Sequence, residues 1–546
     1  MAVHTAHIPA LSFTSAMIPA GGSVTHGRGI GGRQRAYGAT FEALLNEAFP
    51  GCAPAEDAGL RRHEVVVRAS GGTASRYALQ QFEANMHGLE AQVDMVLVEF
   101  APNDGFMTLS PNMKQENQMV AKRSGGAAAG SLSGERVIQW YTEALVRKVL
   151  GLRTANGTLA AAAVWLESSW MGEGLRDALL ERNAPAATGT ARAHVHAPMR
   201  ANARMMDVTE LMASLSHHAV LSWYGIPTVS LVDVMAPLTF NSFGVWNEGG
   251  YDASSAFAWS NIAADRCCHP NLPGHHVMAL MLARELDREA QFYGVPRVKE
   301  EEDVSARPLS SSTTSAGAST LHVSRVKCVA PGSESDSKHA HLRPLLWLSP
   351  SDERKYLSPP YFNLDFMNPR LELGTVMAPG GLGWSFEEDV PGKQGLIARE
   401  AGSHAAIVLP MSDVQRAHPE VDRIVLVIGY LSSYQGFSSV SYWIDQTPSL
   451  AAERADALDP RRCRRDFNMT LERQVIDATR LSNRGNVSVF ESAATKPIAV
   501  GDKPMYLHVC LHPDVARLTV DAARRRTKGK FKLLSVVAMH GGEGSE

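Results

Sequence analysis

The turn 19–32 holds the residues with the clearest chemical potential, because it combines Ser23 with a run of glycines. It follows a short apolar run, 8–18, and precedes an amphipathic segment. Small-residue turns between a strand and a helix are where α/β proteins place a nucleophile or a phosphate. The turn alone leaves two interpretations open: either Ser23 is chemically active, or the glycines hold a ligand.

Alternating strands and helices are predicted for the first half of the chain. Apolar runs predict the strands and apolar side chains at helical spacing predict the helices; the strands are expected at 8–18, 65–67, 93–100, 159–166 and 227–235. Their connections are too long for hairpins, which favours a parallel sheet with helices on both faces, a three-layer α/β/α domain.

Three of these strand ends carry small or polar turns, at Gly22-Ser23, Gly72-Thr73 and Asn103-Asp104. Ligands of open parallel sheets bind at the carboxyl ends of the strands. We therefore expect the three turns to converge on one site.

A change of composition divides the chain. Residues 299–341 are first acidic and then rich in Ser, Thr, Ala and Gly, which is typical of a linker. Beyond them, turn residues separate short β-type runs at 405–409, 423–430, 438–444, 487–490, 505–511 and 533–539. This rhythm predicts an antiparallel β-sandwich. The expected domains are 1–297, a flexible linker 298–341, and a structural or carbohydrate-binding sandwich 342–546.

Other site motifs lack support. Gly27, Gly29 and Gly32 match a dinucleotide-binding loop by spacing, but no strand runs directly into them and no acidic residue ends a second strand. P-loop, zincin and nucleophile-elbow motifs are not found. Adjacent histidines at 217–218 and 275–276 would point about 100° apart on a helix, so one ion cannot easily bind both. We expect structural or surface roles for them, and no metal site.

Four short blocks in this order resemble those of the SGNH (GDSL-like) hydrolase family. Residues 22–27 are similar to its first block, Gly-Asp-Ser-x-Thr-x-Gly, with glycine in place of the aspartate. Gly72 resembles the glycine of the second block, and 98–104 resembles the third, Gly-x-Asn-Asp, with alanine in place of its glycine. His-Pro-Asn at 269–271 is similar to the fifth block. The resemblance covers about residues 10–295.

The resemblance implies a serine hydrolase that needs neither metal nor organic cofactor. Ser23 would be the nucleophile and His269 its base, while Asp265 would fix the tautomer of the imidazole. The family places its aspartate three residues before the histidine, where this chain has Arg266. Asp265 lies one residue earlier, so a Ser-His dyad held by a backbone carbonyl is the alternative.

An oxyanion hole is implied as well, formed by the backbone N–H groups of Ser23 and Gly72 and the side-chain amide of Asn103. The predicted function is hydrolysis of a carboxylic ester through an acyl-serine intermediate. The substrates that the resemblance implies are acetylated carbohydrates, lipids or small acyl esters, and the appended sandwich favours a polysaccharide among them. The alternatives are an acyltransferase that acts on a sugar hydroxyl and a degenerate, purely binding protein.

Composition limits the partners of this chain of 546 residues. Its net charge of -3 gives no general attraction to nucleic acid or anionic lipid. No apolar run approaches the roughly 20 residues of a membrane-spanning helix. We therefore expect neither nucleic acid as a partner nor a transmembrane segment.

The expected compartment depends on weaker signals. Glycosylation sequons at Asn156, Asn468 and Asn486 favour a secretory or extracellular route, although residues 1–20 do not form a convincing signal peptide. Cys463 and Cys510 are candidates for a disulfide, with free thiols as the alternative.

Overall fold

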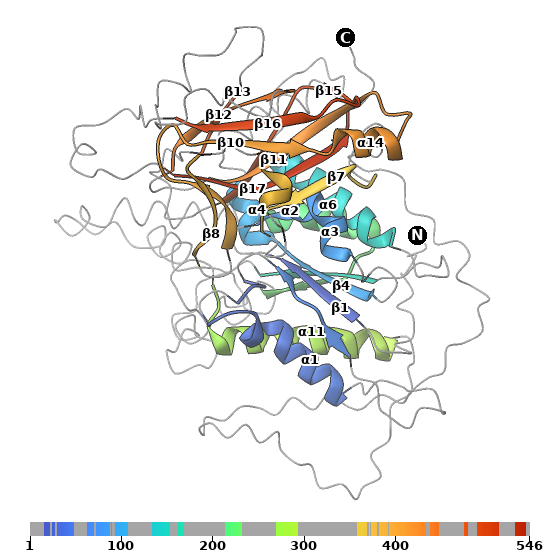
Figure 1. The fold of residues 1–546 in the computed structure, drawn as a ribbon. Helices are drawn as coiled ribbons and strands as arrows, with labels where there is room; N and C mark the ends of the chain where they lie inside the picture. The colour runs from blue at the N-terminus through green and yellow to red at the C-terminus, as the bar shows by residue number, and fades with distance from the viewer. Residues whose placement is uncertain are drawn as a thin grey trace, which may run out of the picture.

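In a computed structural model of the protein, the first half of the chain forms a parallel sheet and the second half forms antiparallel sheets that lie over it (Figure 1). The structure describes residues 16–21, 24–27, 30–48, 63–69, 73–87, 89, 93–107, 134–152, 162–168, 213–231, 269–292, 358–367, 371, 373–378, 382–390, 393–432, 437–446, 474–478, 489–512 and 530–541.

The six-stranded sheet has the order β2-β1-β4-β5-β6, and β3 also pairs with β1. All of these pairs are parallel, as predicted. The strands are β1 (Ala16–Gly21), β2 (Glu64–Val65), β3 (Arg68–Ala69), β4 (Val93–Glu99), β5 (Ala162–Glu167) and β6 (Thr228–Ser230).

One strand prediction needs correction. β1 is described from Ala16 to Gly21, past the end of the predicted run 8–18, whose residues 8–15 lie outside the described part of the chain. The prediction at 65–67 is wrong, because these residues do not form one strand. There the chain pairs with the start of β1 through β2 and with its end through β3, and it leaves the ladder between them.

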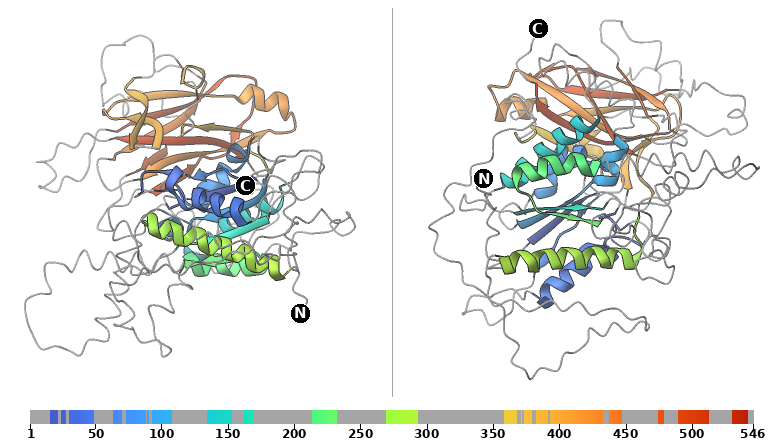
Figure 2. Two further views of the ribbon diagram at one scale, coloured as in Figure 1. Left: turned by 90° about the horizontal axis from the view of Figure 1, so that it is seen from below. Right: turned by 180° about the vertical axis from the view of Figure 1, so that it is seen from behind.

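Helices cover both faces of the parallel sheet (Figures 1 and 2). Met95 and Leu97 of β4 pack against α1 (Tyr37–Ala48) and α11 (Leu272–Phe292). Val96 and Val98 point to the opposite face, as alternation along a strand requires, and share a core with α2 (Ser75–Gln80), α3 (Phe82–Met86), α6 (Gly134–Leu150) and the helix 213–224.

Shorter helices complete this half: η1 (Arg33–Arg35) and α4 (Ala101–Met107). Sequence periodicity predicts one helix with Leu79 and Leu89 on its apolar face, whereas the chain breaks at Gln81 into α2 and α3. The turn predicted at 101–105 is the helix α4. The sequence also predicts that Asp207 caps the helix seen at 213–224, with Glu210 three residues after it, and both residues lie outside the described part of the chain.

The second half of the chain forms two antiparallel sheets. One has the order β10-β16-β12-β13, and the other β14-β11-β17-β9-β8, with β15 paired to β11 and β7 to β17. The strands are β7 (Phe362–Asp365), β8 (Trp384–Val390), β9 (Lys393–Ala398), β10 (His404–Leu409), β11 (Arg423–Ser432), β12 (Ser439–Asp445), β13 (Gln474–Asp477), β14 (Val489–Ala494), β15 (Ile498–Ala499), β16 (Met505–Leu511) and β17 (Phe531–His540). Their short helices are α13 (Leu373–Val376) and α14 (Met411–Ala417).

A single apolar core joins these two sheets. It includes Ile407 and Leu507 from one sheet and Ile428 and Leu533 from the other. All six predicted β-type runs fall on strands. Five described strands were not predicted: β7, β8, β9, β13 and β15. Of these, β8 and β13 lie at sheet edges, where a strand can carry charged and polar residues.

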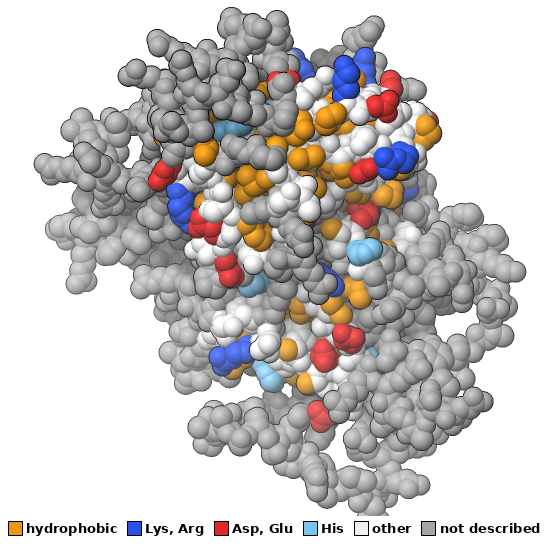
Figure 3. Space-filling view, viewed as in Figure 1, with side chains coloured by type: hydrophobic (Ala, Val, Ile, Leu, Met, Phe, Trp, Pro, Cys, Tyr) orange, Lys and Arg blue, Asp and Glu red, His pale blue; other side chains and the backbone are white. Residues whose placement is uncertain are grey.

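The described surface carries charged side chains of both signs (Figure 3). Figure 3 shows side chains of both charge signs scattered over this face, without a large patch of either sign among the coloured residues. Among the helices that the structure describes, none has the length and apolar character needed to span a membrane. Cys510 is disulfide-bonded, and the other five cysteines, Cys463 included, lie outside the described residues.

Candidate active site

The register of the parallel sheet brings the ends of three strands to one level. Gly21 at the end of β1 is paired with Ala69 of β3 on one side and with Glu99 of β4 on the other. Ser23 follows the first of these residues by two positions, Gly72 follows the second by three, and Asn103 follows the third by four. The three predicted turns therefore leave the sheet from adjacent strands at the same edge.

Of the predicted site residues, Asn103 and His269 lie within the described part of the chain. Both side chains are buried, with exposed fractions of 4% and 6%. Ser23, Gly72 and Asp265 lie outside the described residues, so their roles stay predictions.

His269 stands directly before the last helix of the first half, α11. Asn271 caps that helix, because its Oδ1 accepts a hydrogen bond of 3.0 Å from the N–H of Gly274. The cap fixes where α11 begins and so holds the backbone two residues after His269. The predicted helix opening at 269–275 is confirmed.

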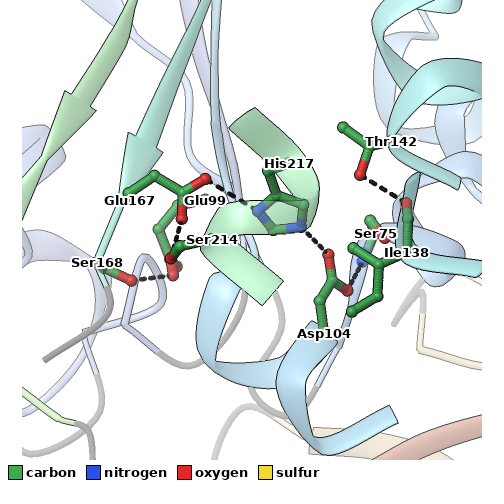
Figure 4. Close-up of polar contacts among 9 residues, drawn as sticks. All are labelled: Ser75, Glu99, Asp104, Ile138, Thr142, Glu167, Ser168, Ser214 and His217. Carbon is green, nitrogen blue, oxygen red and sulfur yellow. Dashed lines mark hydrogen bonds and ion pairs between the residues drawn. The ribbon is translucent and has the colours of Figure 1, made fainter. Parts of the chain in front are cut away.

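A buried carboxylate, Glu99, anchors the turn that contains Ser23. The hydroxyl of Thr25, two residues after Ser23, donates a hydrogen bond of 2.9 Å to Oε2 of Glu99. The other oxygen of Glu99 accepts from the hydroxyl of Ser168, which follows β5 (Figure 4). Burial raises the pKa of Glu99 to about 6, and the two hydroxyl donors lower it in part. Glu99 therefore ties the first block to the ends of β4 and β5.

A second buried carboxylate, Asp104, joins the second and third blocks. Its Oδ1 accepts a hydrogen bond of 2.8 Å from the backbone N–H of Ser75, the first residue of α2. The N-cap residue Ala74 makes no side-chain capping bond, so Asp104 supplies the acceptor and the negative charge that a helix N-terminus favours. Because Asp104 follows Asn103, this bond couples the start of α2 to the predicted amide donor.

His217 lies between two carboxylates in the interior (Figure 4). Its Nε2 is 2.8 Å from Oδ2 of Asp104, and its Nδ1 is 2.9 Å from Oε1 of Glu167. Glu167 ends β5 and also accepts a bond of 2.7 Å from the hydroxyl of Ser214. Since both ring nitrogens face carboxylates, both act as donors.

The charge state of His217 follows from these neighbours. Burial by itself would lower the pKa of His217, but the charge of Glu167 and the hydrogen bonds to Asp104 and Glu167 outweigh it and raise the pKa to about 10. At neutral pH the ring is therefore an imidazolium that links helix 213–224 to α4 and to the end of β5.

The two adjacent histidine pairs diverge, as predicted. His217 and His275 are fully buried, whereas His218 and His276 are exposed. Nδ1 of His275 accepts a bond of 3.2 Å from the N–H of Tyr37, and burial together with the charge of His269 lowers the pKa of His275 to about 4. In the described part of the chain no group of His, Cys, Asp and Glu side chains is arranged to hold a metal ion.

The glycines after Ser23 form a compact turn. The sequence predicts a flexible lead into the first helix at 27–32. Within it the carbonyl of Gly27 accepts hydrogen bonds from the N–H groups of Ile30 and Gly32, while residues 28 and 29 lie outside the described part of the chain. Gly27 has φ +78°, and an added Cβ would lie 2.5 Å from the carbonyl oxygen of Gly32. The first helix, α1, begins only at Tyr37, which removes the helix N-terminus that a dinucleotide-binding loop requires.

Sequence reasoning missed the buried ionic residues Glu99, Glu167 and His217. A signal was present for the two glutamates, because each follows a run of at least four apolar residues at the end of a strand, where an ionised side chain needs partners. No comparable signal was present for His217, whose partners are distant in the sequence.

Comparisons with known proteins give structural similarities only. No protein-family model matches the sequence, and none of the curated proteins matches it. The structure resembles that of a two-domain esterase active on acetylated mannans, co-crystallized with mannopentaose. The identity is 14%, the match covers 97% of this chain and 92% of that one, and the TM-score is 0.44.

Two further solved structures match about half of this chain. One is an acetylxylan esterase from Geobacillus stearothermophilus, with 15% identity over 51% of this chain and 96% of that one and a TM-score of 0.29. The other is a lipase/acylhydrolase from Enterococcus faecalis, with 10% identity over 50% and 95% and a TM-score of 0.27.

Proposed function

We propose that the protein is a serine esterase of the SGNH type that removes acyl groups, with carbohydrate O-acetyl groups as the favoured substrate. The observation that carries the proposal is the common level of Gly21, Ala69 and Glu99 in the sheet, from which the three predicted turns extend. The buried side chains of Asn103 and His269 add to it.

In the proposed reaction His269 takes the proton of Ser23 as the serine oxygen attacks the ester carbonyl. The tetrahedral intermediate collapses to an acyl-serine, and the protonated imidazole returns its proton to the leaving alcohol. Water then attacks the acyl-serine, and the same histidine takes its proton as base. The bond between the acyl carbon and the serine oxygen breaks, the carboxylic acid leaves, and the imidazolium returns the proton to Ser23. Asp265 orients the imidazole in this scheme, and a backbone carbonyl replaces it in the dyad alternative.

The developing oxyanion would be bound by the N–H groups of Ser23 and Gly72 and by the amide of Asn103. One such donor contributes on the order of 3 kcal/mol of transition-state stabilisation. Two buried carboxylates support this scheme. Glu99 accepts a hydrogen bond from the hydroxyl of Thr25, two residues after Ser23, and Asp104, the residue after Asn103, accepts one from the N–H of Ser75.

The substrate class follows from the four SGNH-like blocks, which imply an ester substrate such as an acetylated carbohydrate. The appended β-sandwich is the reason for favouring acetylated polysaccharides within that class. We interpret residues 1–297 as a three-layer hydrolase domain, 298–341 as a linker, and 342–546 as an appended β-sandwich.

A fluorophosphonate probe with intact-protein mass spectrometry tests the nucleophile. The wild type should gain one adduct, and Ser23→Ala should gain none. Ser222→Ala, which removes an exposed hydroxyl on helix 213–224, is the matched control and should label like the wild type. A folded wild type without an adduct would refute the esterase and leave the binding-protein alternative.

Acetylated xylan and mannan oligosaccharides then distinguish the two acyl-transfer alternatives. Release of free acetate supports the hydrolase. Transfer of acetate to an added sugar, without release, supports the acyltransferase.

A further inference from the structure

Helix α2 (Ser75–Gln80) lies between the parallel sheet and the antiparallel sheets of the second half (Figure 1). All six of its residues are buried, although a helix on a surface normally buries only one stripe. One side packs against α6 and β1. The other side meets the second half of the chain, so α2 belongs to the junction between the two halves.

Three side chains of α2 contact strand β14 (Val489–Ala494) of that second half. The ring of Tyr77 lies edge-on to Phe490, with a centroid distance of 4.4 Å, and joins the apolar core of the antiparallel sheets. Nε2 of Gln80 donates to the hydroxyl of Ser492 at 3.1 Å, and Nη2 of Arg76 donates to the carbonyl of the same residue at 3.1 Å.

These polar contacts are buried, since Arg76 and Gln80 are each only 5% exposed. A buried polar group that loses its partner carries the full desolvation penalty, so the contacts hold α2 in one place on β14. The close packing of Tyr77 against Phe490 also holds α2 in this position.

The position of α2 bears directly on the predicted oxyanion hole. Gly72 lies three residues before Ser75, the first residue of the helix. The N–H of Ser75 is bonded to Asp104, next to Asn103, and α4 itself packs against β14. Asn103, one of the predicted oxyanion donors, therefore belongs to a helix that rests on β14, and the helix that follows Gly72 in the sequence contacts the same strand.

We propose that β14 is a positioning element for the oxyanion hole, which makes the second half of the chain part of the catalytic apparatus as well as an appended domain. The inference rests on the proposed esterase function. Its physical basis is geometric: misplacing catalytic groups by about 1 Å can cost about 10²-fold in rate, and losing one oxyanion donor costs about 10²- to 10³-fold in kcat.

Substitutions in β14 of the full-length protein test the proposal. Phe490→Ala should lower kcat for an acetyl ester by about tenfold or more, with KM changed much less, because the donors act in the transition state. Phe490→Leu should restore most of kcat. Phe531→Ala is the matched control, since Phe531 belongs to the same core but packs against Trp384 and Tyr430. It should keep kcat within about twofold in protein that remains folded.

Ser492→Ala provides a milder test should Phe490→Ala not fold. It removes the hydroxyl that accepts from Gln80 and leaves the carbonyl that accepts from Arg76. We expect kcat to fall about threefold to tenfold, with KM nearly unchanged. An unchanged kcat in Ser492→Ala and in every folded Phe490 variant would overturn the proposal.

Hydrogen exchange separates this inference from the proposed function. Backbone amides of 75–80 and 101–107 should exchange faster in Phe490→Ala or Ser492→Ala than in the wild type, and Phe531→Ala should leave them unchanged. A wild type without esterase activity would refute the proposed function, while exchange would still decide whether β14 fixes these segments. Unchanged exchange at both segments in the β14 variants would refute the coupling even in an active enzyme.

Discussion

Nε2 of His217 lies 2.8 Å from Oδ2 of Asp104, so an imidazole from helix 213–224 holds the residue that follows the predicted oxyanion donor Asn103. The same ring contacts Glu167, and Asp104 in turn accepts from the N–H of Ser75. One buried cation thereby connects β5, α4 and α2. The following predictions concern this network and the turn around Ser23.

Replacing His217 should strongly destabilise the protein. His217→Ala leaves the buried carboxylates of Asp104 and Glu167 without their cation, and breaking such a pair costs about 3–5 kcal/mol of unfolding free energy. Urea unfolding followed by circular dichroism measures the loss. The exposed neighbour provides the control, because His218→Ala should stay within about 0.5 kcal/mol of wild type. Equal effects of the two substitutions would contradict the network.

Stability should fall as the pH rises from neutral. The pKa of His217 is raised from 6.5 to about 10, so between these values the folded state keeps a proton that the unfolded chain has released. The protonated His217 therefore contributes its full amount to the free energy of unfolding below pH 6.5. This contribution is lost as the pH rises to about 10, at up to about 1.4 kcal/mol per pH unit.

Urea unfolding at pH 7, 8 and 9 measures this slope, and His217→Gln serves as the reference that lacks the titrating ring. The wild type should lose more stability than the variant over the same range. Parallel slopes would show that the proton on His217 does not contribute. Burial also raises the pKa of Glu99, from 4.5 to about 6. The free energy of unfolding should therefore also fall as the pH rises between about 4.5 and 6.

Removing the hydroxyl of Thr25 should affect both stability and catalysis. Thr25→Val keeps the shape of the side chain but leaves Oε2 of Glu99 without this donor, at a cost of about 1–3 kcal/mol. We expect a reduced kcat as well, because Thr25 anchors the turn two residues after Ser23. Thr25→Ser retains the hydroxyl and should behave nearly like the wild type. The Tm and the kcat for ester hydrolysis of the three proteins test this prediction. A Thr25→Val protein with the Tm and kcat of the wild type would exclude the anchoring role.

A side chain at Gly27 should destabilise the first-block turn. In Gly27→Ala the residue would keep φ near +78°, and its Cβ would meet the carbonyl of Gly32, so we expect a loss of about 1–3 kcal/mol or more. Gly374→Ala is the control, since Gly374 lies in the short helix α13 with no atom within 4 Å of an added Cβ. Calorimetry should show a lower Tm for the first variant and an unchanged or slightly higher one for the second. A Gly27→Ala protein with the Tm of the control would mean that the turn relaxes freely.

Local patterns in the sequence were enough to predict the parallel sheet and its helical covering. Period-two alternation places Met95 and Leu97 on one face of β4 and Val96 and Val98 on the other, and these assignments need no knowledge of distant residues. Short blocks and their order also led to Asn103 and His269 through the family resemblance, and their roles in the site stay predictions. The six predicted β-type runs in the second half follow from the same local rule.

Only the folded chain brings together residues that carry no joint signal in the sequence. His217 lies 113 positions from Asp104 and 50 from Glu167, and Arg76 lies 416 positions from Ser492. Such contacts depend on strand order, on the register of the sheets and on how the two halves pack, because a side chain's charged and polar neighbours are set by tertiary distance. Propensity and periodicity report on neighbours a few residues away, so the carboxylate network and the support of α2 by β14 became visible only in three dimensions.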